Sequence, residues 1–390
     1  MSARPASGRS PRLGDERGAA LVMVLVLLTA VLGTMALAVD VGMLFAARGE
    51  TQRAADAAAL AGASAFVDLP AGSAEVTART RAMDYAARNA VQGVPIRPGE
   101  VTVQVVADSS KVRVWIRRPG ITTWFGRFIG RDSMAVGARA AARAMDAPST
   151  HCVKPFLPPD LWADVDDDRN HNRVWDEDED WKYEPGKGDR YVPVQAKSSP
   201  PSNSNAPSVT SGSTAATGYG STYRGSQRDW GRPIVLKVNS AKVSPLPGWF
   251  YLWAMPVPGG SGKSDANGAQ FRENIGSCND AEIRTDQSYD LLNGNRVGPT
   301  EQGVDDLIAQ DPGAQWDDAT GTVVGSRFSS WMQSPRMIKV PLYDPAQLAD
   351  DGSQVRFQKF AWVFLEESDK KSDGVAGRYV NTVRTLQLVE

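Results

Sequence analysis

The chain has 390 residues and a formal net charge of −2 at pH 7, from 43 Lys and Arg against 45 Asp and Glu. This balance argues against nucleic acid as the main partner, because a domain that binds nucleic acid carries a basic patch or stripe. The length leaves room for two domains beyond a membrane anchor.

An apolar segment near the N-terminus runs directly into an alanine-rich one. Residues 18–39 carry no charged side chain, and a helix of that length crosses a hydrocarbon core about 30 Å thick. Asp40 ends the apolar run, but no proline or turn cluster follows before Phe66, and alanine has the highest helix propensity. We therefore predict one unbroken helix over residues 18–66, with a transmembrane part at 18–40.

A cleaved secretory signal is the alternative, with Ala36 to Ala38 as its cleavage site. An uncleaved anchor is favoured, because the apolar core of a signal usually spans about 7 to 15 residues and helical sequence continues through the supposed cut. Four arginines precede the span, whereas the first cation after it is Arg48. The positive-inside rule therefore predicts that residues 1–17 lie in the cytoplasm and residues 41–390 outside the inner membrane.

The sequence beyond the anchor predicts a helix followed by an antiparallel sheet. An amphipathic pattern stops at a Gly and a Pro, and two runs of alternating valines then flank a polar turn. The aromatic sequence TWFGRFIG follows, and we interpret it as a plug for the sheet. The expected elements are a helix over 73–92 and strands over 101–107, 111–118 and 132–144. With the end of the long helix they predict a small pilin-like domain over residues 41–147.

The long helix and the third strand carry the landmarks of a known family. These landmarks are Arg17-Gly18, the apolar span, AVDVG at 38–42, the small-residue run at 52–61 and TTWFGRFIGRDSMAVGARAAA at 122–142. They resemble the N-terminal domain of TadG-like proteins of the Flp (tight adherence) pilus-assembly system, over about residues 16–145. The resemblance implies a single-pass protein of the bacterial inner membrane, whose partners are other Flp/Tad pilus-assembly or pilin-like subunits.

Two features depart from that family pattern. Prepilins have a glycine cleavage site followed by a glutamate five residues into the mature chain, and neither Gly14 nor Gly18 fits this rule. Longer members of the family carry a von Willebrand A domain with a DxSxS metal motif, which this sequence lacks. The resemblance therefore implies a TadG-like protein without that domain, whose helix stays in the membrane.

Short extended segments separated by turns predict a mostly β domain over residues 148–390. The expected elements are strands over 234–238, 249–257, 336–344, 357–367 and 378–390, and a helix over 300–310. Residues 198–228 are too poor in apolar groups to fold alone, and we interpret them as a flexible Ser/Pro/Gly-rich loop. The predicted fold class is α+β, with a long transmembrane helix, a pilin-like domain and a mostly β domain.

Cysteine usage agrees with a location outside the cytoplasm. Cys152 and Cys278 are the only two cysteines, and an even pair in an oxidising compartment predicts one disulfide. Two buried thiols are the alternative. The disulfide would tie the start of the C-terminal domain to its middle, which typically stabilises a fold by about 2 to 4 kcal/mol.

The acidic sequence after the first cysteine has the spacing of a calcium-binding loop. Oxygen side chains fall at positions 1, 3, 5, 9 and 12 of an EF-hand-like loop, with a backbone carbonyl at position 7. The predicted ligands are Asp168, Asn170, Asn172, Val174, Asp176 and Glu179. Arg173 occupies position 6, where EF-hands have Gly, and a shifted set begins at Asp164. A solvated acidic turn is the alternative, and a bound calcium would be structural.

The sequence offers no group of residues suited to catalysis. Its histidines are His151 and His171, and it has no GxSxG, HExxH or phosphate-binding glycine loop. We therefore predict a protein that is not an enzyme and has a structural role in Flp-type pilus assembly or surface attachment. One alternative is a calcium-dependent surface adhesin that binds glycan or protein, using tryptophans near the acidic loop. Another is a periplasmic hydrolase that uses paired carboxylates.

Overall fold

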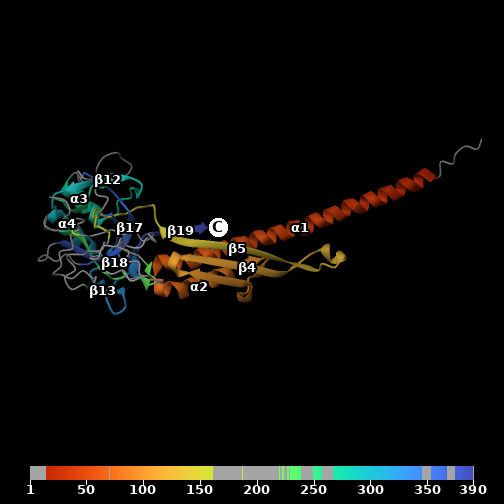
Figure 1. Cartoon of the computed structure of the whole chain (residues 1–390), viewed down its shortest axis with the longest axis horizontal. Helices are drawn as coiled ribbons and strands as arrows, with labels where there is room; N and C mark the ends of the chain where they lie inside the picture. Colours follow the sequence, from red (N-terminus) through yellow and green to blue (C-terminus); the bar gives the residue numbers. More distant parts are fainter. Residues whose placement is uncertain are drawn as a thin grey trace, which may run out of the picture.

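The computed structural model describes residues 15–69, 71–160, 229–238, 249–256, 267–344, 353–366 and 374–389, together with 187, 219, 222–223 and 226–227. The fold class is α+β, as predicted. A long helix is followed by a sheet that lies along part of it, and then by a compact domain of short strands and helices (Figure 1).

α1 is a single helix over Asp15–Asp68, which confirms the prediction of one continuous helix. Its first part stands clear of the rest of the chain, and its second part lies against the sheet (Figure 1). The sequence explains this division, because the first part presents large apolar side chains on all sides and the second is rich in alanine. The fully buried alanines of the second part are Ala47, Ala54, Ala55, Ala58, Ala59, Ala63 and Ala65.

α2 covers Ala71–Ala87 and packs beside α1. It ends before residue 92, the predicted end, because the chain turns there into the short strands β1 (Ala90–Val91) and β2 (Val94–Pro95). Gln92 and Gly93, between these strands, have φ angles of 51° and 74°. Two successive residues in the left-handed region close a two-residue hairpin, so the polar end of the helical pattern belongs to a turn.

Four antiparallel strands form the sheet on which α1 and α2 pack. In sheet order they are β19 (Arg384–Val389), β5 (Ser133–Asp146), β4 (Lys111–Thr122) and β3 (Val101–Val106). The last three confirm the predicted hairpin and third strand. Val112, Val114 and Ile116 of β4 are buried in one core with the alanines of α1, because alternate residues of a strand face the same side.

The strand predicted over residues 378–390 is two strands that belong to different sheets. β18 (Gly374–Thr382) lies in the C-terminal domain, whereas β19 pairs with β5 along its whole length. Val383 is the corner between them, and its carbonyl accepts the N–H of Ala147 at 2.8 Å. The C-terminal domain therefore ends at this corner and not at residue 390. A short, polar alternating strand pairs with whichever sheet offers an open edge, and its sequence does not specify which.

The C-terminal domain holds two antiparallel sheets, with strand orders β15-β17-β18-β9 and β10-β12-β16. Their other strands are β9 (Pro233–Val238), β10 (Trp249–Trp253), β12 (Ser288–Asn293), β15 (Met337–Leu342), β16 (Gln354–Arg356) and β17 (Lys359–Leu365). The two-stranded pairs are β6 (Ser149–Thr150) with β11 (Ile283–Arg284), β7 (Thr222–Tyr223) with β8 (Ser226–Gln227), and β13 (Gln315–Asp317) with β14 (Thr322–Val324). The short 3-10 helix η6 (Trp331–Gln333) also lies in this domain. The 3-10 helices η1 (Pro98–Glu100), η2 (Ala107–Ser109) and η3 (Gly126–Ile129) lie instead among the strands of the first sheet.

Two helices pack against each other in this domain. α4 covers Val297–Ile308, close to the helix predicted over 300–310. α3 covers Gly268–Gly276 and was missed by the sequence analysis. Its start is marked by Asn267, whose side chain accepts the N–H of Gln270 at 2.9 Å. An asparagine N-cap is a readable signal, but a helix of this length gives too short an apolar repeat to stand out.

The same substitution at Gly49 and Gly62 of α1 is expected to have opposite effects on stability. A Cβ at Gly62 would lie 2.9 Å from Cγ1 of Val112 and 3.0 Å from the carbonyl oxygen of Ala78, whereas a Cβ at Gly49 meets no atom within 4 Å. Gly to Ala in a helix gains about 1 kcal/mol, and overpacking a core costs about 1 to 3 kcal/mol. Thermal unfolding followed by circular dichroism should give a higher Tm for Gly49→Ala and a lower Tm for Gly62→Ala. Two increases would contradict the close packing.

Candidate functional site

Residues 18–39 of α1 present apolar side chains that the rest of the chain does not cover. Leu21, Met23 and Leu27 are all largely exposed, and no residue of the most apolar stretch is buried. A water-exposed surface of this size requires an apolar partner. By length and composition the helix suits either a single membrane span or a secretory signal near the N-terminus.

Asp40 lies where the exposed apolar part of α1 ends, and its side chain is removed from water. Its Oδ1 accepts the N–H of Trp124 at 2.8 Å, and its Oδ2 accepts the N–H groups of Phe125 at 3.0 Å and Gly126 at 2.6 Å. A carboxylate taken out of water is costly unless it is hydrogen-bonded, and three backbone donors meet that need. Asp40 therefore fixes the loop between β4 and β5 to the side of α1.

We call this loop, residues 123–132, the β4–β5 tip. It is braced from within, because the hydroxyl of Thr123 donates to the carbonyl of Arg131. Our prediction that its aromatic side chains plug the sheet is wrong, since Trp124 and Phe128 are 62% and 77% exposed. The helix-facing side of the sheet is already filled by the alanines of α1 and α2, so the aromatic rings lie outside that core.

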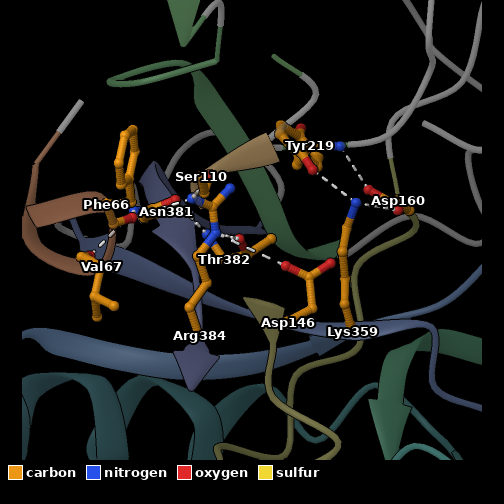
Figure 2. Close-up of polar contacts among 10 residues, drawn as sticks. All are labelled: Phe66, Val67, Ser110, Asp146, Asp160, Tyr219, Lys359, Asn381, Thr382 and Arg384. Carbon is orange, nitrogen blue, oxygen red and sulfur yellow. Dashed lines mark hydrogen bonds and ion pairs between the residues drawn. The ribbon is translucent and has the colours of Figure 1, made fainter. Parts of the chain in front are cut away.

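Residues from the end of the chain cap the C-terminal end of α1 (Figure 2). The last carbonyl groups of a helix have no partner within it. The side-chain amide of Asn381 donates to the carbonyl oxygens of Phe66 and Val67, at 3.4 and 3.1 Å, and Nη1 of Arg384 donates to Phe66 at 3.1 Å. The charge of Arg384 also faces the negative end of the helix dipole. This cap joins the two domains.

A buried ion pair forms the second cluster in Figure 2. Nζ of Lys359 lies 2.8 Å from Oδ2 of Asp160, and both side chains are buried. Asp160 also accepts the N–H of Tyr219 at 2.7 Å, and Lys359 donates to the carbonyl of Tyr219 at 2.6 Å. A buried pair is stable only when such hydrogen bonds complete it. The cluster holds the chain together at the two residues that flank 161–218.

The disulfide predicted between Cys152 and Cys278 is present. Lys154 lies close to it in the chain, and its Nζ donates to the carbonyl of Ser277 at 2.5 Å. Burial, together with the nearby charge of Lys339, lowers the pKa of Lys154 to about 8. The end of the C-terminal domain that holds the disulfide therefore contains a buried amine with a lowered pKa.

The predicted calcium ligands lie outside the described residues. They are Asp168, Asn170, Asn172, Val174, Asp176 and Glu179. Within the part of the chain that the structure describes, no group of three or more His, Cys, Asp or Glu could hold a metal ion. Calcium binding therefore stays a prediction from the sequence.

Three polar contacts that shape this molecule were missed by the sequence analysis. Asp40 was read only as the end of the apolar run, although a single carboxylate at that position is itself a signal that something must bind it. The Asn381 and Arg384 cap, like the Lys359 pair, joins residues far apart in the chain. No local pattern marks contacts of that kind.

Comparison with known proteins identifies the N-terminal helix. Residues 18–65 match a family model described as "Putative Flp pilus-assembly TadE/G-like". The match covers both the exposed and the packed parts of α1 and ends before the sheet, so it does not extend to residue 145 as the predicted resemblance did. No curated protein and no solved structure matches the chain. The chain therefore carries a TadE/G-like domain at residues 18–65.

The free energy of unfolding is expected to rise between pH 8 and pH 10. Burial lowers the pKa of Lys154 and Lys237 to about 8, whereas an unfolded lysine titrates near pH 10.4. In this window the unfolded chain binds more protons than the folded one, so stability increases with pH. Above pH 10 the free energy of unfolding falls again. Burial raises the pKa of Tyr219 and Tyr251, so the unfolded chain loses these protons before the folded one does.

Urea unfolding at several pH values measures this dependence. Lys154→Met should flatten the rise, whereas Arg356→Met, which removes an exposed charge, should leave it unchanged. An equal slope in the protein and in Lys154→Met would contradict the role of the buried amine.

Calcium is expected to raise the melting temperature, because a ligand that binds only the folded state stabilises it. Asp168→Ala and Glu179→Ala should each abolish the increase, since they remove oxygens from the predicted positions 1 and 12. Asp305→Ala, an exposed acidic residue on α4, is the matched control. Differential scanning fluorimetry with calcium and with chelator measures the effect, and identical curves for the unchanged protein would remove calcium from consideration.

Proposed function

We propose that this chain is a single-pass envelope protein with a structural, non-enzymatic role in Flp-type pilus assembly or surface attachment. The TadE/G-like domain at residues 18–65 supports involvement with the pilus-assembly machinery. The partners in this proposal are the inner membrane and other Flp/Tad pilus-assembly or pilin-like subunits.

The continuity of α1 is the observation that carries the proposal. The helix passes from its exposed apolar part into the packed core without a break. A membrane-embedded first part would therefore hold the sheet at a fixed distance and direction from the bilayer. Cleavage after Ala38 would instead leave Asp40 next to a new, charged N-terminus, where the first turn of a helix frays. The contacts of Asp40 favour an anchor that is kept.

Charge and redox chemistry support the orientation with the N-terminus in the cytoplasm. Arginines precede the apolar span, and the next cation is Arg48. The Cys152–Cys278 disulfide indicates an oxidising compartment for the bulk of the chain. In the proposed arrangement residues 41–390 are periplasmic or extracellular.

The connection between the two domains suits a protein that holds its C-terminal domain in a fixed orientation relative to the membrane. β19 completes the first sheet, and Arg384 caps α1, so the C-terminal domain is bound to the anchored unit by more than a linker. A partner that binds the C-terminal domain would therefore be held in a defined orientation above the membrane. Holding a partner in this orientation is the structural role that we propose.

Deletion of the gene is expected to abolish Flp pili and surface attachment. Pili are counted by electron microscopy, and attachment is measured by retention of cells on an abiotic surface. The full chain should restore both. A Val26→Arg, Leu28→Arg variant should not, because each charge at the centre of a span costs about 2.5 to 3.5 kcal/mol on insertion. Gly49→Ala is the matched control on the same helix and should restore both.

Three outcomes separate the proposals. Normal pili and attachment in the deletion strain would overturn the structural role. Normal pili with lost attachment would favour a surface adhesin over pilus assembly. Recovery of the mature chain from the soluble fraction, shortened by residues 1–38, would replace the anchor with a cleaved signal.

A further inference from the structure

We propose that the β4–β5 tip inserts its aromatic side chains into the headgroup region of the membrane that α1 crosses. The chain would then contact the bilayer at two points, the helix and the tip. Asp40 would set the depth of the tip relative to the hydrocarbon core. This inference rests on the membrane anchor of the proposed function.

The position of the tip along α1 is set by hydrogen bonds. Asp40 accepts three backbone N–H groups from the tip, and it follows directly after the uncharged residues 18–39. Twenty-two helical residues rise about 33 Å, which is close to the thickness of the hydrocarbon core. The tip is therefore tied to α1 at the level where hydrocarbon gives way to headgroups. In Figure 1 the hairpin of β4 and β5 runs beside α1, with its closed end toward the exposed part of the helix.

The side chains that the tip exposes are those that favour this layer. Trp124, Phe125 and Phe128 are 62%, 43% and 77% exposed. Tryptophan and other aromatic rings gather at membrane interfaces, where an apolar ring meets a polar surrounding. Phe45, which is 70% exposed, lies five residues after Asp40 on α1 and adds a ring about 8 Å further from the core. Exposed aromatic rings therefore lie both on the tip and on α1 close to the end of its apolar part.

Charge on the tip agrees with a lipid surface as the partner. Arg127, Arg131 and Asp132 are all exposed, so the tip carries a net charge of +1, and the guanidinium of Arg127 lies 5.5 Å from the ring centre of Phe128. Arginine beside an aromatic ring suits insertion next to lipid phosphates, since the ring enters the layer while the cation stays with the phosphates.

The tip also has the rigidity that an anchoring element requires. Thr123 is buried and donates to Arg131, and the N–H of Arg131 donates to the carbonyl of Gly126 at 2.9 Å. A Cβ at Gly126 would lie 2.8 Å from Oγ1 of Thr123, so the turn accepts no larger residue without moving. Because these bonds use the backbone, the aromatic side chains are left to face outward.

The test uses the full chain in nanodiscs made of equal parts phosphatidylethanolamine and phosphatidylglycerol. The native cysteines form a disulfide, so a single added cysteine can be labelled with an environment-sensitive fluorophore. Phe128→Cys reports on the tip, Tyr85→Cys on the exposed face of α2, and Leu28→Cys on the span. Lipids with a nitroxide near the headgroup or at the chain end quench labels at the matching depth.

The expected result is a blue-shifted label at Phe128→Cys that is quenched more by the headgroup-proximal nitroxide, and no quenching at Tyr85→Cys. Leu28→Cys should be quenched more by the deep nitroxide. Adding Asp40→Ala should remove most of the quenching at Phe128→Cys while leaving that at Leu28→Cys. Circular dichroism is the control that tests whether this variant keeps its helix and sheet.

The outcomes distinguish failure of this inference from failure of the anchor. Quenching at Leu28→Cys without quenching at Phe128→Cys overturns the inference and keeps the anchor. Absence of quenching at both positions overturns the anchor itself. A blue-shifted but unquenched label at Phe128→Cys shows that the tip is covered by protein, such as a second copy, and also overturns the inference. Equal quenching with and without Asp40 removes that residue as the element that sets the depth.

Discussion

The packing of alanine on α1 against the valines of the first sheet is the contact on which the rest of the structure depends. Small side chains bring the helix so close to β4 that a single added methyl group at Gly62 would reach Val112. A close-packed core transmits displacement and does not absorb it. The alanine-rich half of the helix is thereby held in place, and each end of that half contacts another part of the chain. Asp40 meets the β4–β5 tip, and Phe66 meets the cap from the end of the chain.

The first sheet is assembled from both ends of the sequence. β3, β4 and β5 follow α2 after the short hairpin of β1 and β2, but β19 arrives only with the last described residues of the chain. Contacts between residues so far apart cost loop entropy before they contribute stability, and they make folding slow. The Cys152–Cys278 bond shortens the effective distance, because it ties the chain just after β5 to the middle of the C-terminal domain. The two domains are therefore linked in stability as well as in space.

Local sequence patterns predicted the parts of this structure that local physics decides. The uniform apolar run and the alanine run gave α1, and alternating valines gave β3 and β4. The choice of sheet for Arg384–Val389 was not predictable, since its exposed alternation fits either edge. The aromatic segment at 123–130 was misread because composition alone does not tell a core ring from an exposed one. Of the predicted site residues, the disulfide pair followed from cysteine count, whereas the calcium loop lies outside the described residues.

The chemistry of Asp40 explains why a charged residue stands at the end of an apolar span. A neutral side chain in that place would tolerate displacement into the hydrocarbon, whereas a carboxylate does not, because its transfer costs several kcal/mol. A carboxylate also accepts several hydrogen bonds at once, and here three successive N–H groups of one turn converge on it. In the proposed membrane anchor the same charge would stop the helix from sliding inward, and it organises a loop whose rings face outward. If α1 is an anchor as proposed, its depth in the membrane and the position of the loop would both follow from this one side chain.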